Sequence, residues 1–229
     1  MTPRGPGGRL LRSLRRRTPR PRRAAALRAQ AREVYRDAIL EAAERVFARS
    51  GFSGTRMAEV AAEAGLATGT LYNYFAGRDE LLSSLVERRS EEMLAAVEQA
   101  ATASRDAGLC ELLVALLGTT FRQVEAHREL FAAVSASAGI SGKHMAAIAR
   151  QCLASQKSYQ QVIGEALGRA AAAGQLRADL PIDILVGVFL GAAHGVMRAW
   201  MTQDPDVQPL VDQAPAVVDL YLRGASPPT

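Results

Sequence analysis

Residues 65–75 read Gly-Leu-Ala-Thr-Gly-Thr-Leu-Tyr-Asn-Tyr-Phe, and this stretch predicts a tight turn followed by a very short helix. Leu71 and Phe75 lie four residues apart, so both side chains point to one face of that helix. The rest of its surface carries hydrogen-bonding groups from Thr68, Thr70, Tyr72, Asn73 and Tyr74. A helix this short is not stable alone, so it needs support from the helices before it.

Those supporting helices are predicted over residues 37–50 and 56–64, with Gly65 in the turn that follows. A helix, a turn and a polar-faced helix form the arrangement that places a second helix in the major groove of DNA. The same pattern also fits an ordinary three-helix packing unit with tyrosines on its surface. Spacing and residue chemistry alone leave both interpretations open.

Four segments in this region resemble the DNA-binding domain of the TetR family of transcriptional regulators. They are residues 55–61 (TRMAEVA), 64–66 (AGL), 69–75 (GTLYNYF) and 79–82 (DELL). The resemblance extends over residues 38–85, and the rest of the chain matches only in size and helical character. It implies a regulator, most simply a repressor, that binds a palindromic double-stranded DNA operator as a homodimer and responds to a small-molecule effector.

The resemblance also implies roles for individual residues. Thr68, Gly69 and Asn73 match positions that approach base edges, where an amide can pair with adenine and a glycine allows close approach. The positions that hold phosphates, and so fix register, are matched by Thr55, Thr70, Tyr72, Tyr74 and Arg78. Arg56 is expected to supply additional affinity. Surface decoration is the alternative for any one of these residues.

Two residues depart from the family pattern, and one residue is expected to start a helix. Ala58 stands where many relatives carry an arginine that contacts a base, and Ala67 stands where a serine cap is common. Thr68 is therefore expected to cap its helix as well as contact DNA. Thr55 is predicted to cap the helix over residues 56–64 with its hydroxyl group.

Charge is distributed unevenly along the chain of 229 residues, whose formal net charge is +5. Residues 1–36 contain twelve arginines and one glutamate, a net charge of +11, so the remainder carries −6, the difference between +5 and +11. Residues 1–30 also contain four prolines and little apolar surface, and we expect them to form a disordered arm that contacts DNA phosphates. A non-essential extension, created by the choice of start site, is the alternative.

Hydrophobic periodicity after residue 78 predicts six further helices and shows no strand pattern. Their approximate bounds are 79–103, 109–125, 127–137, 143–173, 182–202 and 207–223. The sequence therefore predicts an all-α protein of about nine helices. We expect a disordered arm at residues 1–30, a helix-turn-helix domain at 31–78 and a ligand-binding and dimerisation domain at 79–229.

The helix over residues 182–202 is hydrophobic nearly all round, so it must be buried. Its most apolar run, residues 184–193, is ten residues long and is predicted to be too short to span a bilayer. The family resemblance implies that the last two long helices pair with their symmetry mates. We predict a homodimer interface, with burial in the chain's own core as the alternative, at Gly187, Gly191, His194, Gly195 and Arg198.

A small-molecule pocket is expected among the central helices, because helical bundles place ligands in their cores. The candidate lining residues are Phe121, Phe131, Met145, Cys152, Tyr159 and Met197. The same large or soft side chains also fit an ordinary core. The sequence does not specify the chemistry of the effector.

Catalysis, metal binding and a cofactor are not expected. His127, His144 and His194 are far apart, and none has a suitable partner three or four residues away. The chain has no glycine-rich phosphate loop with lysine, no nucleophile elbow and no Cys–His pairing. Cys110 and Cys152 are predicted to be buried free thiols, with a redox pair as the alternative, and free thiols indicate a reducing, cytoplasmic compartment. No membrane association is expected, because the most apolar run is short.

Two other functions remain open from the sequence. One is a protein that coats DNA without sequence preference, driven by the basic arm. The other is a helical bundle that binds small molecules and keeps only a vestigial helix-turn-helix.

Overall fold

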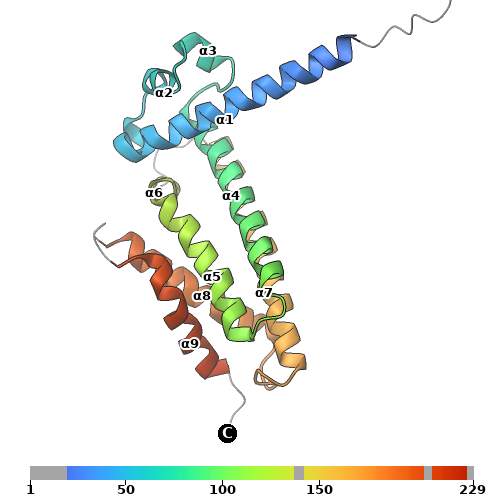
Figure 1. Ribbon diagram of the computed structural model, residues 1–229. Coiled ribbons are helices and arrows are strands. Elements are labelled where there is room, and N and C mark those ends of the chain that lie inside the picture. The colour runs from blue at the N-terminus through green and yellow to red at the C-terminus, as the bar shows by residue number, and fades with distance from the viewer. Residues whose placement is uncertain (1–19, 137–141, 204–207, 226–229) are drawn as a thin grey trace, which may run out of the picture. The chain divides into compact units, whose positions relative to one another are not determined.

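The computed structural model describes residues 20–136, 142–203 and 208–225, and these residues form helices and no strand (Figure 1). The elements are α1 (Arg20–Gly54), α2 (Met57–Glu63), α3 (Thr68–Tyr72), α4 (Arg78–Ala103), α5 (Leu109–Ala126), α6 (Arg128–Ala136), α7 (Gly142–Ala172), α8 (Ile182–Met201), the 3-10 helix η1 (Leu210–Gln213) and α9 (Ala214–Ala225). The expected all-α fold of about nine helices is confirmed. The chain divides into two compact units, residues 1–38 and 39–229.

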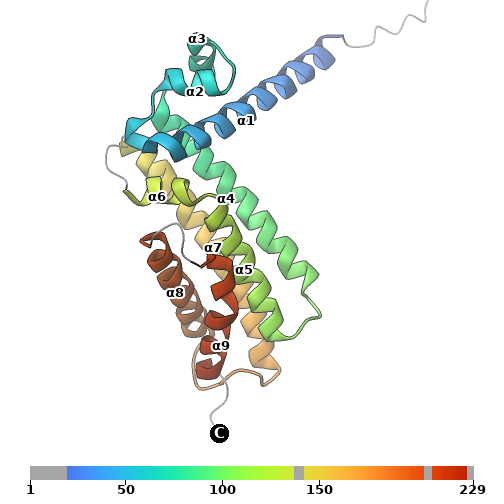
Figure 2. The same ribbon diagram turned by 60° about the vertical axis from the view of Figure 1, so that its left-hand side comes forward.

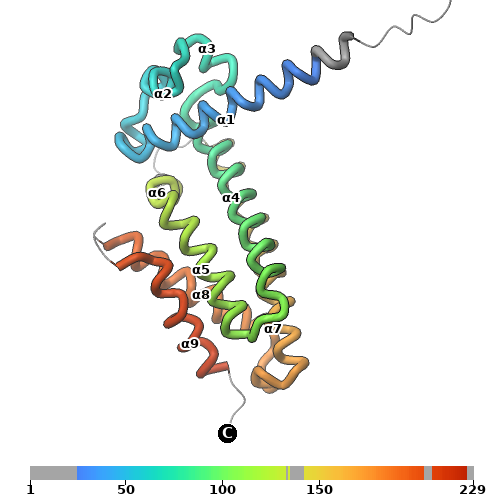
Figure 3. The backbone as a smooth tube through the Cα atoms, viewed as in Figure 1, coloured from blue at the N-terminus to red at the C-terminus, as the bar shows by residue number. Residues whose placement is uncertain are grey.

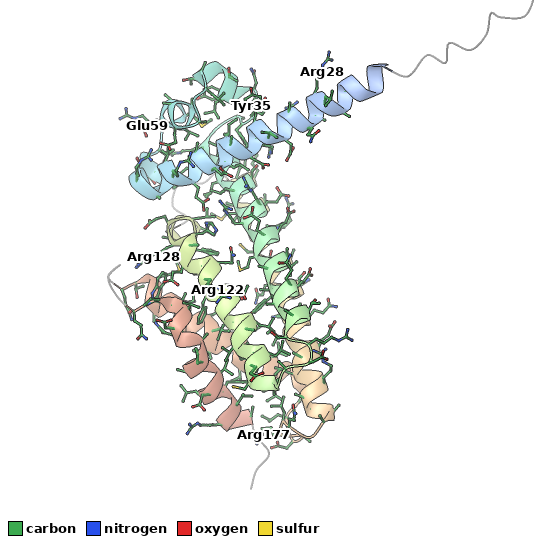
Figure 4. All side chains as sticks on the ribbon, viewed as in Figure 1. Arg28, Tyr35, Glu59, Arg122, Arg128 and Arg177 are labelled. Atoms are coloured by element: carbon green, nitrogen blue, oxygen red, sulfur yellow. The ribbon has the colours of Figure 1, made fainter. Side chains whose placement is uncertain are left out.

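The first unit contains the N-terminal part of α1. Residues 1–30 were expected to be disordered, whereas residues 20–30 are helical; residues 1–19 lie outside the described part of the chain. Residues 24–33 contain five alanines, one leucine and no glycine, proline or β-branched residue, so intrinsic propensity favours the helix despite the density of arginine. Arg28 and Tyr35 project from this helix in Figure 4.

The second unit contains two hydrophobic cores. The first core joins the rest of α1 to α2, α3 and the start of α4, and its most buried large side chains include Phe47, Leu71 and Phe75. Leu130 from α6 and Ile148 from α7 also belong to this core. The helix-turn-helix therefore shares its core with two helices from later in the chain.

The second core lies among α4, α5, α7, α8 and α9. The backbone in Figure 3 runs down α4, back up α5 and, after α6, down α7, so α4 and α7 are parallel and α5 is antiparallel to both. Figures 1 and 2 both show α4, α5 and α7 as neighbours, with α8 and α9 beside them. These helices position the cavity described below.

The C-terminal segment differs from its prediction as one helix over residues 207–223. Residues 210–213 form η1, and α9 begins at Ala214. Pro209 precedes η1 and Pro215 occupies the first turn of α9, where its missing N–H group costs no hydrogen bond. The prolines therefore divide the segment in two.

Helix α8 is the one described helix that is long and apolar enough to cross a membrane by length and composition. The prediction from residues 184–193 that this segment is too short was wrong, because the helix continues through His194 and Arg198 to Met201. A single helix of this kind is weak evidence for a membrane span. Only 28% of its most apolar window is buried within the chain, so much of its apolar surface is left uncovered.

Candidate functional site

The turn between α2 and α3 is built around Gly65, whose φ of +68° lies in the left-handed region that favours glycine. The Leu66 N–H donates to the Ala61 carbonyl at 2.8 Å, and the Gly65 N–H donates to the Ala62 carbonyl at 3.1 Å. This hydrogen-bond pattern is the Schellman motif that ends helices at glycine. It fixes the direction in which the chain leaves α2 and enters α3.

Helix α3 presents one apolar side and one polar side. Leu71 and Phe75 are buried, while Thr68, Gly69, Tyr72 and Asn73 are exposed and Thr70 and Tyr74 are half-buried. A Cβ atom added at Gly69 would meet no other atom within 4 Å. The protein itself therefore places no steric demand on this glycine, and the space above it is open to a bound molecule.

Thr55 does not have the predicted capping role. Its side chain is buried, and its hydroxyl group donates to the Gly51 carbonyl at 2.8 Å. Arg56 is the residue at the N-cap of α2, and no side chain caps this helix. Similarly, Ala67 is the N-cap of α3, so the expected cap from Thr68 is also wrong. The inward hydrogen bond of Thr55 leaves its hydroxyl proton unavailable to a phosphate.

The Arg78 side chain contacts the end of α1 and so stabilises the fold. Its Nη1 atom donates to the Ser53 carbonyl at 2.7 Å, and its guanidinium carbon lies 5.0 Å from the centre of the Phe52 ring. These contacts tie the start of α4 to the end of α1. Arg56, in contrast, is largely exposed, and among the described residues it makes one long ion pair, 3.9 Å, with Glu59, which Figure 4 shows on α2.

Ion pairs from two arginines of α1 hold α2 against α1. Arg45 and Arg49 on α1 each lie 2.7 Å from a different carboxylate oxygen of Glu63, at the end of α2. Hydrogen bonds from Arg45 and Arg49 hold the pKa of Glu63 below its ordinary value. These ion pairs restrain α2 at the end that leads into the turn and α3.

An ionic network joins the helix-turn-helix region to the helical bundle. The Glu44 carboxylate on α1 accepts from the Nδ1 atom of His127, at the end of α5, at 2.7 Å, and it also accepts from Arg89 on α4. Arg89 in turn donates to Glu92. Burial alone would raise the pKa of Glu44, but the hydrogen bonds from His127 and Arg89 outweigh burial and lower it. Nothing in the sequence signalled this network, because its members are up to 83 residues apart.

Replacing Glu44 with glutamine is expected to lower the free energy of unfolding at pH 7 by about 1–3 kcal/mol, because hydrogen bonds between charged groups are lost. Since the pKa of Glu44 is lowered by folding, its stabilising contribution is present above the unfolded-state pKa of about 4.3 and is lost as pH falls through the lower folded-state value. Urea unfolding of both proteins should therefore show a difference that shrinks below about pH 4.

Glu41→Gln is the matched control for this change. Glu41 is more exposed and lies 3.3 Å from Arg88, so its loss should cost less than about 1 kcal/mol. Equal effects of the two substitutions, or a Glu44→Gln effect independent of pH, would contradict the assignment of the network.

A cavity of about 250 Å³ lies among α4, α5, α6, α7 and α8. Its walls are mainly apolar, and its large side chains include Leu117, Phe121, Val124, Phe131, Leu190 and Met197. The polar groups are few. Thr120 and Tyr159 lie 3.1 Å apart between their hydroxyl oxygens, and burial raises the pKa of Tyr159. Such a cavity suits a mainly apolar ligand with few polar groups.

The structure brings five of the six predicted ligand residues to this cavity: Phe121, Phe131, Cys152, Tyr159 and Met197. Met145 is not among the lining residues. Helical periodicity did not single out Leu117, Val124 or Leu190, because a cavity wall and an ordinary core have the same apolar spacing. Cys152 and Cys110 are free and exposed, so the prediction of buried thiols was wrong.

Helix α6 contributes to both the cavity and the core of the helix-turn-helix region. Phe131 lines the cavity, while the preceding residue, Leu130, is buried in the first core. Arg128 donates to the Gln203 carbonyl at 2.6 Å and lies over the Trp200 ring, with 4.5 Å between its guanidinium carbon and the ring centre. Figure 4 shows Arg128 at the start of α6. A displacement of α6 would therefore change the packing of both hydrophobic cores.

The uncovered surface of α8 and α9 carries large apolar side chains. Ile184 and Val188 on α8 and Leu220 on α9 are exposed. The predicted interface residues Gly187, Gly191, His194, Gly195 and Arg198 are exposed as well. His194 also lines the cavity. Added Cβ atoms at the three glycines would meet nothing within 4 Å, so another chain could approach this surface closely.

A helix-turn-helix joined to a helical bundle defines a class of DNA-binding proteins, and comparison with known proteins supports this assignment. Residues 39–85 match the model of bacterial regulatory proteins of the tetR family. The fatty acid metabolism regulator protein of Bacillus subtilis is 21% identical over 81% of this chain and 93% of its own length.

Solved structures show the same fold. The fatty acid degradation regulator FadR of Bacillus halodurans is 24% identical, with a TM-score of 0.67 over 83% of this chain and 95% of its own. FadR of Bacillus subtilis, solved in complex with stearoyl-CoA, is 22% identical, with a TM-score of 0.65 over 82% of this chain and 97% of its own.

Residues 39–85 therefore form the DNA-binding domain of a TetR-family transcriptional regulator, and the described part of the chain has a TetR-like fold with an N-terminal helix-turn-helix domain and a C-terminal helical domain. The family is not enzymatic.

Proposed function

We propose that this protein is an effector-responsive repressor that binds a palindromic operator in the cytoplasm as a homodimer. The observation that carries the proposal is the position of α6, which contributes Phe131 to the apolar cavity and Leu130 to the core beneath the helix-turn-helix. A ligand that displaces Phe131 must also disturb the packing of its neighbour. The packing of α6 would thereby couple the cavity to the DNA-binding surface.

The proposed DNA-binding surface consists of the exposed residues of α3 and its flanks. Thr68, Gly69 and Asn73 are assigned to base edges, and their exposure supports this assignment. Arg56, Thr70, Tyr72 and Tyr74 are assigned to phosphates. Thr55 and Arg78 are reassigned to supporting roles, because their polar groups bond to the protein backbone.

The proposed dimer interface is the uncovered face of α8 and α9. Ile184, Val188, Gly191, Gly195 and Arg198 recur at intervals of three or four residues, so they lie along one side of α8. Burial of this apolar surface against a second copy is the favourable step. A twofold dimer would present two α3 helices to half-sites separated by about 34–36 Å, one turn of DNA.

The proposed effector is a molecule with a long apolar chain, such as a fatty acyl group. The apolar walls of the cavity support this assignment, as does the stearoyl-CoA complex of the Bacillus subtilis relative. The effector would release the operator by binding more tightly to a conformer in which the two α3 helices no longer match adjacent grooves. Its effect cannot exceed its difference in affinity for the two conformers.

Selection of random duplex DNA by the purified full-length protein tests this proposal. We expect the selected sequences to share a palindromic motif with two half-sites about 10 base pairs apart, centre to centre. A protein lacking residues 1–30 should select the same motif, with lower affinity if the arginines contact phosphates. Failure to enrich any motif, together with binding that depends steeply on salt, would favour the DNA-coating alternative.

A further inference from the structure

A second cavity, of about 440 Å³, lies between α4, α5 and α7. Its volume is in the range of about 300–1,000 Å³ that is usual for small-molecule sites. Its floor is apolar and includes the buried side chains of Leu112 and Leu116 on α5. Exposed charged side chains of both signs also line it, namely Glu98, Arg105, Glu165 and Arg169. The proposed regulator function uses none of these four residues.

The four charged groups make no ion pair among the described residues. Glu165 and Arg169 are four residues apart on α7 with the glutamate first, which is the order and spacing that best favour an ion pair on a helix. Instead of pairing with Arg169, the Glu165 carboxylate accepts from the side chain of Gln161 at 3.2 Å. The charges that line the cavity are therefore available to a bound molecule.

The two signs of charge are separated along the cavity. Helices α4 and α7 run parallel to each other (Figure 3). In both chain segments the glutamate comes before the arginine, since Glu98 precedes Arg105 and Glu165 precedes Arg169. Because the helices are parallel, both carboxylates lie toward one end of the cavity and both guanidinium groups toward the other. The cavity therefore has an acidic end and a basic end.

The spacing of the charges sets the length of a matching ligand. The helical rise per residue gives about 6 Å between Glu165 and Arg169, and about 10 Å between Glu98 and Arg105, which lies in the turn after α4. An extended peptide advances about 3.3–3.6 Å per residue, so two or three residues span this distance. Thr102, between Glu98 and Arg105, donates its hydroxyl proton to the Glu98 carbonyl at 2.9 Å and keeps lone pairs that can accept from a peptide N–H.

A ligand with one sign of charge does not suit this arrangement. An anion bound by the two arginines would also face the two carboxylates, and a cation bound by the two glutamates would also face the two guanidinium groups. The four side chains together have no net charge. A neutral molecule with a positive and a negative end matches both halves of the cavity.

We propose that the second cavity is a separate binding site for a short zwitterion with the length of a di- or tripeptide. Its ammonium group pairs with the two glutamates, and its carboxylate receives hydrogen bonds from the two arginines, whose planar guanidinium groups suit a carboxylate. Its apolar side chains lie on Leu112 and Leu116. This site goes beyond the proposed acyl effector and does not use the first cavity.

Calorimetric titration of the full-length protein with trialanine tests the proposal. Two analogues serve as matched probes, because N-acetyl-trialanine lacks the ammonium group and trialanine amide lacks the carboxylate. The native protein should bind trialanine at least about fivefold more tightly than either analogue, since each analogue loses one set of charge-assisted hydrogen bonds. No binding of trialanine, or equal binding of the three probes, would overturn the proposed site.

Two double variants test which charges meet which end of the peptide. Glu98→Gln/Glu165→Gln should weaken trialanine binding at least about fivefold and should not weaken N-acetyl-trialanine binding. Arg105→Gln/Arg169→Gln should likewise weaken trialanine binding and spare trialanine amide. Arg150→Gln, which removes an exposed arginine of α7 that lines neither cavity, is the control and should change no affinity. Equal losses for all probes in either double variant would contradict the assignment.

Competition with stearate separates this proposal from that of the acyl effector. Stearate, as a probe of the first cavity, should leave the affinity for trialanine within about twofold of its value in the absence of stearate, because the two sites have different lining residues. Displacement of trialanine by stearate would overturn the second site as a separate one. Binding of trialanine by a protein that binds no stearate would count against the acyl effector alone.

Discussion

Replacing Val188 with glutamate is expected to convert the protein to monomers and to abolish operator binding at nanomolar to micromolar concentrations. Val188 is 58% exposed in the single chain and lies on the uncovered face of α8, so the substitution leaves the fold of each chain intact. In a twofold interface each substitution acts twice, and the two carboxylates would be buried without partners. An uncompensated buried charge costs about 3–5 kcal/mol, which corresponds to a factor of more than about 100 in the dimer dissociation constant.

Sedimentation velocity and operator titration measure these two effects. Leu153→Glu is a close control, because Leu153 on α7 is also 58% exposed but lies outside the proposed interface. It should leave both the sedimentation coefficient and the operator affinity unchanged. A Val188→Glu protein that remains dimeric would place the interface elsewhere, and unchanged operator binding by a monomer would refute the dimeric mode of recognition.

Replacing Gly69 with leucine is expected to reduce operator affinity by about 1–3 kcal/mol for each half-site, the cost typical of a disrupted base contact. For a dimer on two half-sites the total is about 2–6 kcal/mol, or roughly 30-fold to 20,000-fold. The reason is steric, because the added side chain would fill the space that a base edge needs. Stability should be unchanged or slightly increased, since a Cβ at Gly69 meets nothing within 4 Å and leucine favours a helix more than glycine does.

Ala95→Leu is the control for Gly69→Leu, because it adds an exposed side chain to α4 away from the helix-turn-helix. Thermal unfolding and operator titration should be compared for both variants. The assignment of α3 to the major groove would be wrong if Gly69→Leu bound the operator as tightly as Ala95→Leu, or if its affinity fell only in proportion to lost stability.

Much of the fold could be predicted from the sequence, because its determinants are local. Gly65 and Gly174 mark element ends through backbone geometry alone, and the apolar periodicity of α5 and α8 follows from helix geometry. The error at residues 20–30 arose from weighing charge above helix propensity. The error in α8 arose from counting an uninterrupted apolar run instead of the whole helix.

The site was less predictable, because its details depend on contacts between distant residues. Whether Thr55 faces solvent or Gly51, and whether Arg78 is free or bound to Ser53, is decided by tertiary packing. The Glu44–His127 pair has no local signature either. The exposed row on α3 could be predicted, because a five-residue helix with two buried positions leaves few alternatives for the others.

Operator affinity measured at increasing concentrations of stearoyl-CoA tests most directly whether this protein couples an acyl-binding cavity to an operator-binding surface. We predict that operator affinity falls to a plateau, and that stearoyl-CoA binds more weakly in the presence of operator by the same factor, as linkage requires. Operator affinity that stays constant while calorimetry shows stearoyl-CoA bound to the protein would contradict the claim.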